Sequence, residues 1–358
     1  MVSMKIAIAM SGGVDSSLAA YLLQKEGHDV FGLFMKNWEE TRPDGTCHAQ
    51  EDQHDAQRVC AQLGIACYTV NFTKQYQEKV FSSFLTDLKA GLTPNPDILC
   101  NKEIKFKVLY DKAMSLGADK LATGHYCREE NGKLLKGLDP SKDQSYFLYA
   151  IKKHILSNVL FPIGHLEKTE VRKKAKESGI AVHSKKDSMG ICFIGKRNFS
   201  EFISQYLPYQ EGDAVLPDGT LVGKHRGTAF YTIGQRKGLG IGGPGDAYFV
   251  VDKDIKNNKI IVAQGKNHPA LFAPTLIANQ VSWIGEAPSL PFDAEAKIRY
   301  RSPAEKCTVS EDNGNLLVTF EKPQRAITAG QSVVFYQGSV CLGGAIITSI
   351  KKTSTASS

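Results

Sequence analysis

Hydrophobic and polar positions follow two alternating periods through the first half of the chain. Residues 5–10 form a short apolar run typical of a buried strand, and a glycine turn separates them from 16–25, where apolar positions recur at helical spacing until Gly27. Strand and helix patterns continue in alternation, which indicates a parallel, doubly wound α/β sheet. We expect further strands at 30–35, 66–70 and 120–122, and helices at 52–63, 74–90, 101–116 and 169–178.

The pattern changes near Pro208. Short apolar runs broken by glycine and proline follow it and predict a small β-rich domain, and from about Pro274 short strands recur as in a small β-barrel. Because 358 residues exceed one ordinary domain, we predict three domains, at 1–207, 208–273 and 274–358, the last ending in a disordered polar tail. The strands expected are 248–251 and 259–262 in the middle domain and 294–300, 316–320, 332–336 and 344–350 in the barrel.

The composition is that of an ordinary soluble protein. Of the residues, 42% are hydrophobic and 23% are charged, and no apolar stretch approaches the roughly 18 residues of a membrane span. The first strand begins at Lys5, too early for a targeting segment, so we expect a cytoplasmic protein without a membrane partner. The net charge of +7 permits a polyanionic partner, although many enzymes of small metabolites are equally basic.

A glycine-rich segment joins the first strand to the first helix. It reads Ser11-Gly12-Gly13-Val14-Asp15-Ser16-Ser17, at a place where backbone N–H groups and a helix N-terminus converge on an anion and glycine lets a phosphate approach the main chain. The lysine of a Walker A loop is missing. The alternative is a capped helix after a tight turn, but two glycines, an acid and three serines together favour phosphate binding. Such a loop indicates the energy source and leaves the activated group open.

Eight cysteines are spread along the chain without a CxxC pair. This spacing disfavours structural zinc, and a reducing compartment disfavours a disulfide framework. Buried core thiols are the default interpretation, which we apply to Cys60, Cys67 and Cys341.

Two cysteines stand in more unusual settings. Cys100 follows two prolines that exclude helix before Asp97, and a helical pattern begins after it, so its thiol is expected at a helix N-terminus, where nearby Lys102 favours the thiolate. Cys192 lies in the glycine-bracketed apolar run 190–195. Taken alone, each of these cysteines is also expected to be a core thiol rather than a catalyst.

Several segments together resemble one family. The loop at 11–16 resembles the SGGxDS signature of the PP-loop ATP pyrophosphatases, and the whole chain from about Lys5 to Ile350 resembles the bacterial tRNA-specific 2-thiouridylases. The departures are Ala9, where the family usually carries glycine, and Met189, where threonine is common; neither removes a reacting group. The segments that carry the resemblance are MKNW at 35–38, TPNPDILCNKEIKF at 93–106, ATGHY at 122–126, KDQSYFL at 142–148, GICFIG at 190–195, GQRKGLGIGG at 234–243 and CLGG at 341–344.

The resemblance implies a transferase that uses ATP to adenylate the C2 oxygen of the anticodon wobble uridine of tRNA and replaces that oxygen with sulfur. Cys192 is implied to carry a persulfide supplied by a cysteine desulfurase or a relay carrier. Cys100 is implied to release its sulfur, which leaves a disulfide between Cys100 and Cys192. Asp97 is implied to act as acid or base near the uracil, with the N-cap of a helix starting at Asn101 as a nearly equal alternative.

The resemblance also implies two sets of binding residues. Asp15 is further expected to hold Mg²⁺, because a hard cation prefers carboxylate and phosphate oxygens. The ATP contacts are Ala9, Met10, Ser11, Gly12, Gly13, Val14, Asp15, Ser16, Ser17, Met35 and Gly124. The tRNA contacts are Asn95, Pro96, Asp97, His125, Lys142, Asp143, Gln144, Arg299, Tyr300 and Gln331. For the basic segment 168–186, a solvated helix face and an RNA-binding surface are equally good interpretations.

Two other classes of function remain open. One is a PP-loop ligase that adenylates a small metabolite, and the other is a tRNA-binding module with a vestigial loop. Against the ligase, the chain has no glutaminase-like segment, and a ligase leaves the β-rich extension beyond Pro208 without a purpose.

Overall fold

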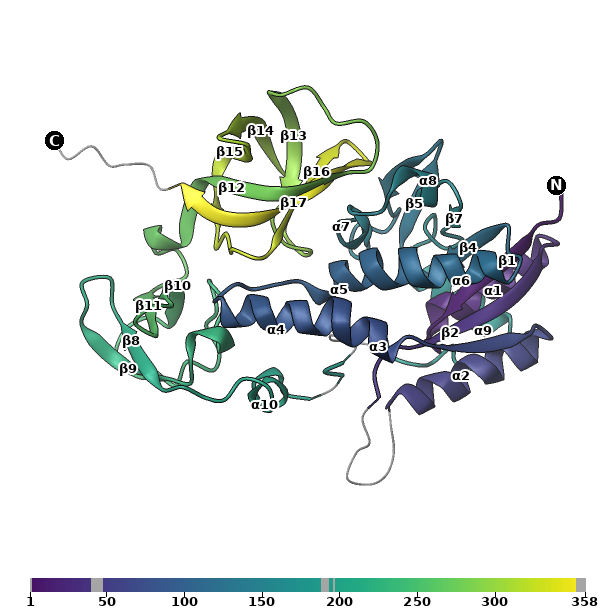
Figure 1. Ribbon diagram of the computed structural model, residues 1–358, viewed down its shortest axis with the longest axis horizontal. Helices are drawn as coiled ribbons and strands as arrows, with labels where there is room; N and C mark the ends of the chain where they lie inside the picture. Colours follow the sequence, from purple (N-terminus) through teal and green to yellow (C-terminus); the bar gives the residue numbers. More distant parts are fainter. Residues whose placement is uncertain (1, 40–47, 188–192, 196, 352–358) are drawn as a thin grey trace.

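The computed structural model describes residues 2–39, 48–187, 193–195 and 197–351 (Figure 1). Within these ranges the chain forms a five-stranded, a four-stranded and an eight-stranded sheet. The predictions for Cys192, for Met189 and for the tail beyond 351 fall outside the described residues. Among the described residues, no helix has both the length and the apolar character needed to cross a bilayer.

The first sheet is parallel, with the strand order β3-β2-β1-β4-β7. Alternate residues of β1 face opposite sides: Ile6 and Ile8 pack into one buried cluster, whereas Ala7 joins the other. This arrangement confirms the predicted doubly wound α/β sheet. Its strands are β1 (Lys5–Met10), β2 (Asp29–Lys36), β3 (Cys67–Asn71), β4 (Lys120–Thr123) and β7 (Val159–Leu160).

The chain order of the strands reverses between β1 and β4, and ligands of such sheets bind outside the carboxyl ends at this point. The helices around the sheet follow the predicted spans closely, but two of them contain π-helical segments. The helical elements are α1 (Val14–Lys25), α2 (His48–Leu63), α3 (Thr73–Tyr76), η1 (Gln77–Phe81), α4 (Ser82–Lys89), α5 (Pro96–Leu99), η2 (Cys100–Leu109), α6 (Tyr110–Ser115), α7 (Ser145–Leu148), α8 (Lys153–Leu156), α9 (Lys168–Glu177), α10 (Phe199–Ser204), η3 (Thr228–Phe230) and η4 (Pro269–Leu271).

The second half of the chain is β-rich, as predicted. A four-stranded sheet has the order β10-β11-β8-β9, and β12 to β17 close a barrel through pairing of β12 with β17. The sequence did not predict β8, β9, β12 or β14. The strands are β8 (Gly212–Val215), β9 (Leu221–His225), β10 (Tyr248–Asp254), β11 (Lys259–Gln264), β12 (Phe272–Trp283), β13 (Phe292–Lys297), β14 (Glu305–Asp312), β15 (Asn315–Arg325), β16 (Ser332–Gln337) and β17 (Val340–Lys351).

A hairpin from the first half of the chain extends the barrel sheet. Its strands, β5 (Cys127–Glu130) and β6 (Lys133–Lys136), follow β4, and β6 pairs antiparallel with the start of β17. Leu134 and Cys341 are paired there, and both are buried. The α/β part and the barrel are therefore joined by main-chain hydrogen bonds, beyond the packing of side chains.

Arg299 links the middle of the chain to the barrel. Its Nη2 donates hydrogen bonds of 2.8 Å to the carbonyl oxygens of Ile233 and Ala326 and to the Thr328 hydroxyl. Its side chain is mostly buried, which lowers its pKa from the ordinary value. This charged donor connects the loop at Ile233 to the barrel residues Ala326 and Thr328. Arg299 therefore has a structural role that the sequence did not indicate.

We predict that Arg299→Ala destabilises the protein. Each hydrogen bond lost from a charged donor costs about 1.5–3 kcal/mol. The Ile233 carbonyl oxygen loses this donor, whereas the Thr328 hydroxyl and the Ala326 carbonyl oxygen keep their bond to each other. Thermal unfolding in the absence of RNA should therefore occur at a clearly lower temperature. Arg301→Ala is the matched control, because Arg301 is exposed on the same loop. Equal melting temperatures for the two variants would contradict the structural role of Arg299.

Candidate active site

The phosphate loop lies at the carboxyl end of β1, where α1 begins. Gly12 has a φ of +71°, and a Cβ at this position would collide with the Asp52 carbonyl group, so only glycine fits. Gly13 is the N-cap of α1 and provides no side-chain cap. The first N–H groups of the helix therefore remain available to an anion, as the sequence predicted for this loop.

Serine hydroxyls hold the shape of the loop. Ser17 is fully buried and donates to the Gly13 carbonyl oxygen at 2.8 Å, and the Ser16 hydroxyl lies 3.1 Å from that of Ser11. Ser11 is exposed. Of the predicted ATP contacts, Ser11 thus faces solvent directly, whereas Met10, Val14, Ser16 and Ser17 support the loop from within.

Asp15 is bound by a buried ammonium group. Lys168 donates to both carboxylate oxygens of Asp15, at 2.7 and 2.9 Å, and the Tyr126 hydroxyl donates to one of them at 2.8 Å. Lys168 is only 8% exposed. This corrects both interpretations of the basic segment 168–186 at its first residue, because Lys168 is neither a solvated surface residue nor part of an open RNA-binding face.

A second lysine of the same basic segment also contacts the loop. Lys185 donates to the Gly12 carbonyl oxygen at 3.1 Å and to the carboxylates of Asp52 and Asp55 at 2.7 and 2.6 Å. Burial lowers the pKa of Lys185, but the hydrogen bonds that its ammonium donates to Asp52 and Asp55 have the larger effect, so the pKa is raised. Lys185 therefore fixes α2 against the phosphate loop. The sequence showed that lysine and arginine cluster in 168–186. It did not show that Lys168 and Lys185 turn towards the phosphate loop.

Asp187 forms ion pairs with three cationic side chains near the phosphate loop. Its carboxylate lies 2.8 Å from the Lys168 ammonium, 2.9 Å from that of Lys142 and 2.7 Å from the Arg172 guanidinium. Partial burial opposes ionisation of Asp187, but Lys168 and Lys142 outweigh it and lower its pKa to about 2. Lys142, predicted as an RNA contact, is thus paired within the chain.

The helix that carries Cys100 begins earlier than predicted. Asn95 is its N-cap and accepts from the backbone nitrogens of Asp97 and Ile98 at 3.1 and 3.4 Å, while Pro96 occupies the first helical position, where its missing N–H costs nothing. Pro96 therefore starts the helix instead of excluding it, whereas Pro94 precedes the cap. The alternative of Asp97 as an N-cap is wrong, because Asn95 has that role.

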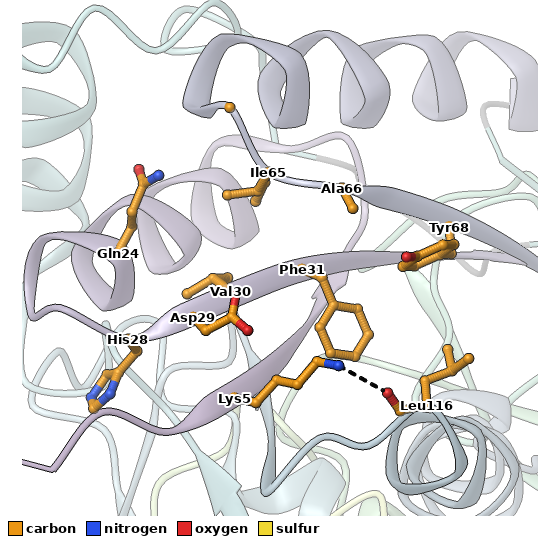
Figure 2. Close-up of a pocket in the computed structure, with 11 residues that line it drawn as sticks. Lys5, Gln24, His28, Asp29, Val30, Phe31, Ile65, Ala66, Tyr68 and Leu116 are labelled. Carbon is orange, nitrogen blue, oxygen red and sulfur yellow. Dashed lines mark hydrogen bonds between the residues drawn. The ribbon is translucent and has the colours of Figure 1, made fainter.

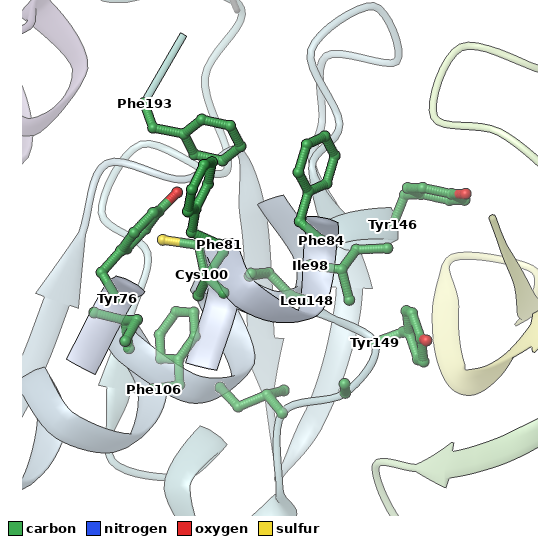
Figure 3. Close-up of a cluster of buried hydrophobic side chains, with 14 of the residues drawn as sticks. Tyr76, Phe81, Phe84, Ile98, Cys100, Phe106, Tyr146, Leu148, Tyr149 and Phe193 are labelled. Atoms are coloured by element: carbon green, nitrogen blue, oxygen red, sulfur yellow. The ribbon is translucent and has the colours of Figure 1, made fainter. Parts of the chain in front are cut away.

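Cys100 lies inside this helix, at the first residue of η2. It is 3% exposed and packs among Tyr76, Phe81 and Phe193 (Figure 3). Lys102, expected to favour its thiolate, is instead exposed beside Glu103. π-Helical turns often mark functional sites, because they aim side chains away from the regular helical positions.

Asp97, Lys105 and His125 form a polar group between this helix and β4. Burial raises the pKa of Asp97, and the charge of Lys105 opposes that shift. The Lys105 ammonium lies 3.4 Å from His125 Nε2, and the Thr123 hydroxyl lies 2.7 Å from His125 Nδ1. Burial, assisted by Lys105, lowers the pKa of His125 well below its usual value, so its imidazole is neutral at pH 7. The role of Lys105 was missed, although Lys105 stands within the segment 93–106.

Gly124 joins this polar group to the phosphate loop. A Cβ at residue 124 would lie 2.6 Å from the Ser16 backbone nitrogen, so β4 ends directly against the start of α1. The predicted ATP contact Gly124 and the predicted RNA contact His125 are consecutive residues at this junction. Met35 and Ala9, at the ends of β2 and β1, are half-buried on the same edge of the sheet.

The other predicted RNA contacts lie where the α/β part meets the barrel. Asp143 is 3% exposed, accepts from the Gly137 and Ser145 nitrogens at 3.1 Å, and lines a cavity of about 150 Å³ with Tyr300. Gln144 accepts from the Tyr126 nitrogen at 2.9 Å. These side chains have partners within the chain, and direct RNA contact by any of them stays a prediction.

A cavity lies at the opposite edge of the parallel sheet, at the amino ends of its strands (Figure 2). It has a volume of about 360 Å³ and is lined by Lys5, His28, Phe31 and Tyr68, among others. These residues belong to the amino ends of β1 to β3 or to the loops before them. None of the predicted site residues lines this cavity, so it is separate from the phosphate loop.

A parallel sheet with a glycine-rich anion loop after its first strand, and no Walker lysine, defines an α/β nucleotide-binding protein of the PP-loop class. Family models match most of the chain: "tRNA methyl transferase HUP domain" at 4–196, "tRNA methyl transferase PRC-barrel domain" at 200–264 and "Aminomethyltransferase beta-barrel domain" at 273–347.

Full-length relatives are more specific than these models. The chain is 52% identical to the tRNA-specific 2-thiouridylase MnmA of Protochlamydia amoebophila, over 96% of this chain and 93% of the relative. It is 55% identical to MnmA 1 of Geobacillus kaustophilus, over 99% of each. The chain therefore belongs to the family of tRNA-specific 2-thiouridylases. A solved 4-thiouridine synthetase–RNA complex with bound ATP is 21% identical over 57% of this chain and 50% of that chain, with a TM-score of 0.35, which is too low to carry an argument.

We predict that Asp187 makes the stability of the protein acid-sensitive in a defined range. The folded-state pKa of about 2 lies below the ordinary value of 3.8, so Asp187 stabilises the fold above pH 3.8 and loses this contribution as the pH falls through about 2. Asp187→Asn should lower the melting temperature at pH 7, and its difference from wild type should shrink from pH 4 to pH 2. A difference that stays constant over this range would contradict the ion-pair account.

Proposed function

We propose that the protein is a tRNA-uridine 2-sulfurtransferase that converts the wobble uridine of tRNA to 2-thiouridine, with release of AMP and pyrophosphate. One observation carries the proposal: Gly124 touches the phosphate loop, and the next residue, His125, faces Lys105 on the helical segment that also carries Asp97 and Cys100. A nucleotide site and a second polar site with a cysteine are thus adjacent. The shared name of the full-length relatives supports the same reaction.

The first half-reaction activates the uridine. Its C2 oxygen is a poor leaving group, so this oxygen attacks the α-phosphorus of ATP, the bond to the β-phosphate breaks, and pyrophosphate leaves. The N-terminal N–H groups of α1 are positioned to bind the departing pyrophosphate. Lys168 and Lys185 add positive charge beside the loop, which compensates the charge of the phosphates.

The uridine is recognised after it leaves the anticodon loop. Its base is unpaired there, so turning it outward costs little. Asp97, whose pKa is raised by burial, can donate or accept a proton near the uracil. In neutral His125, Nε2 lies against the Lys105 ammonium and Nδ1 against the Thr123 hydroxyl, so contact with the edge of a uracil requires one of these partners to be exchanged.

The second half-reaction uses two thiols. Cys192 receives a persulfide from a sulfur-donor protein, a cysteine desulfurase or a relay carrier. The Cys100 thiolate attacks the inner sulfur of this persulfide, a Cys100–Cys192 disulfide forms, and the released hydrosulfide attacks C2 so that AMP leaves with the oxygen. A thiol reductant then restores both cysteines. Because Cys100 is buried, this step requires its aromatic neighbours to move apart.

Magnesium fits the charged group at the phosphate loop. The carboxylates of Asp15 and Asp187 converge on the same Lys168 ammonium, and Mg²⁺ is usually held by one or two carboxylates together with substrate phosphates. When bound, the ion would supply charge stabilisation on the transferring phosphates. Asp15 is the residue we assign to it first, with Asp187 as its second carboxylate.

Localisation and domain division belong to the same proposal. An enzyme that consumes ATP and modifies tRNA has both substrates in the cytoplasm. We retain 1–207 as the ATP and cysteine domain, 208–273 as the middle domain and 274–358 as the tRNA-binding barrel with its tail.

Methyl transfer appears only in the descriptions of the matched domain models, whereas the full-length relatives are named as thiouridylases. No observation favours a ligase of small metabolites.

We predict that substitutions separate the two half-reactions. Asp15→Ala should abolish AMP formation, because it removes the carboxylate assigned to the magnesium ion at the phosphates. Cys192→Ser and Cys100→Ser should retain tRNA-dependent pyrophosphate release and lose both AMP release and thiolation, because activation of the uridine needs neither thiol, whereas AMP leaves only when sulfur attacks C2. Pyrophosphate release, AMP release and 2-thiouridine formation are all measured in a single turnover with labelled sulfur.

Wild-type protein supplies the positive control, and omission of tRNA supplies the negative one. Cys100→Ser should still accumulate a persulfide on Cys192. Normal AMP formation by Asp15→Ala would contradict the assignment of the loop to ATP and magnesium binding. Thiolation at the wild-type rate by either cysteine variant would contradict the two-thiol mechanism.

A further inference from the structure

The loop before the catalytic helix is bound by the barrel through its main chain. The Thr93 nitrogen donates to the Ala329 carbonyl oxygen at 2.9 Å, and the Thr93 carbonyl oxygen accepts from Gln331 Nε2 at 2.8 Å. Both hydrogen-bonding groups of this peptide are therefore satisfied by one barrel loop. The two segments are 236 positions apart in sequence, counted as 329 minus 93, so only the assembled fold creates this contact.

The barrel side of the contact is rigidly held. The Gly330 nitrogen donates to the Ile347 carbonyl oxygen at 2.8 Å, and the Ile347 nitrogen donates to the Gln331 carbonyl oxygen at 2.8 Å, so the loop is tied to β17. Gly330 has a φ of +89°, and a Cβ at this position would lie 2.8 Å from the Thr93 nitrogen. The barrel loop therefore presses directly against Thr93, with no space for a larger residue.

The other side of the contact leads directly to the reacting groups. Asn95, two residues after Thr93, caps α5, and this helix presents Asp97 and continues into Cys100. The middle domain touches the same loop, because a Cβ on Gly91 would collide with the Ile255 side chain in the turn between β10 and β11. Figure 1 shows α4, which ends just before this loop, extending towards the β8–β11 sheet. Residues 91–95 thus lie where all three parts of the molecule meet.

We propose that the barrel loop Ala329–Gln331 positions the catalytic helix: by fixing Thr93 it sets the Asn95 cap, and with it the placement of Asp97 and Cys100 relative to the phosphate loop. Gln331 is then a positioning residue, a role different from the RNA contact that the resemblance implies. This inference rests on the proposed function. It implies that the reaction needs the barrel even before RNA is bound, because the barrel would complete the geometry of the site.

The first test introduces a methyl group at the contact without removing any polar group. Gly330→Ala should displace Thr93, and a misplacement of about 1 Å at a reacting group lowers rates by about 100-fold. We expect a large loss in the single-turnover rate of tRNA-dependent AMP formation at saturating tRNA, with unchanged tRNA affinity. Gly314→Ala is the matched control, because Gly314 also has a positive φ, of +76°, in the same barrel but has no neighbour within 4 Å.

The second test removes one hydrogen bond. Gln331→Met keeps the length of the side chain but cannot donate to the Thr93 carbonyl oxygen, whereas Gln331→Lys restores a donor. The positioning role predicts that kcat falls in the methionine variant and recovers in the lysine variant, while the KM for tRNA is unchanged in the methionine variant. If Gln331 serves only as an RNA contact, KM rises in the methionine variant and kcat stays the same, which overturns the proposal.

The outcomes separate this inference from the proposed function. Absence of tRNA-dependent AMP formation by the wild-type protein would reject the proposed function itself. Wild-type activity together with equal rates for Gly330→Ala and Gly314→Ala would reject only the positioning role. Melting temperatures are measured for every variant; if Gly330→Ala fails to fold, the kcat and KM of the two Gln331 variants decide.

Discussion

The end of β4 passes so close to the start of α1 that residue 124 has no space for a side chain. This close approach is the constraint on which the site depends, because the residues around Gly124 serve both halves of it. Tyr126 reaches back to the Asp15 carboxylate at the phosphate loop, and His125 faces Lys105 on the helix that carries Cys100. A strand that ended further away would separate the phosphate loop from the helical segment that carries Cys100.

Charge holds this arrangement on one side and the barrel holds it on the other. Lys168 and Lys185 each join a carboxylate to the phosphate loop, so the loop keeps its shape while it carries acidic neighbours. The Lys168 ammonium is already buried, so binding of a polyphosphate would exchange its partners instead of creating buried charge. On the far side, the main-chain contacts at Thr93 and the hairpin pairing of β6 with β17 connect the α/β part to the barrel.

The sequence predicted the elements whose periodicity is local. The strand at Lys5–Met10 and the glycine turn after it were predicted correctly, because apolar runs and glycine turns report short-range structure. Asn95 was missed as a cap because Pro96 was interpreted as a helix breaker, although proline fits the first helical position. Three other features depend on residues far apart in the chain, and one sequence contains no pattern for them. They are the contact of the Lys168 side chain with Asp15, the pairing of β6 with β17 and the contact at Thr93.

The central claim is that this chain activates and thiolates the wobble uridine of tRNA. Mass spectrometry of nucleosides from the tRNA of cells with and without the protein tests it most directly. The account predicts that 2-thiouridine derivatives disappear when the protein is absent and return when the wild-type chain is supplied, but do not return with the Cys100→Ser chain. Unchanged levels of 2-thiouridine derivatives in cells that lack the protein would contradict it.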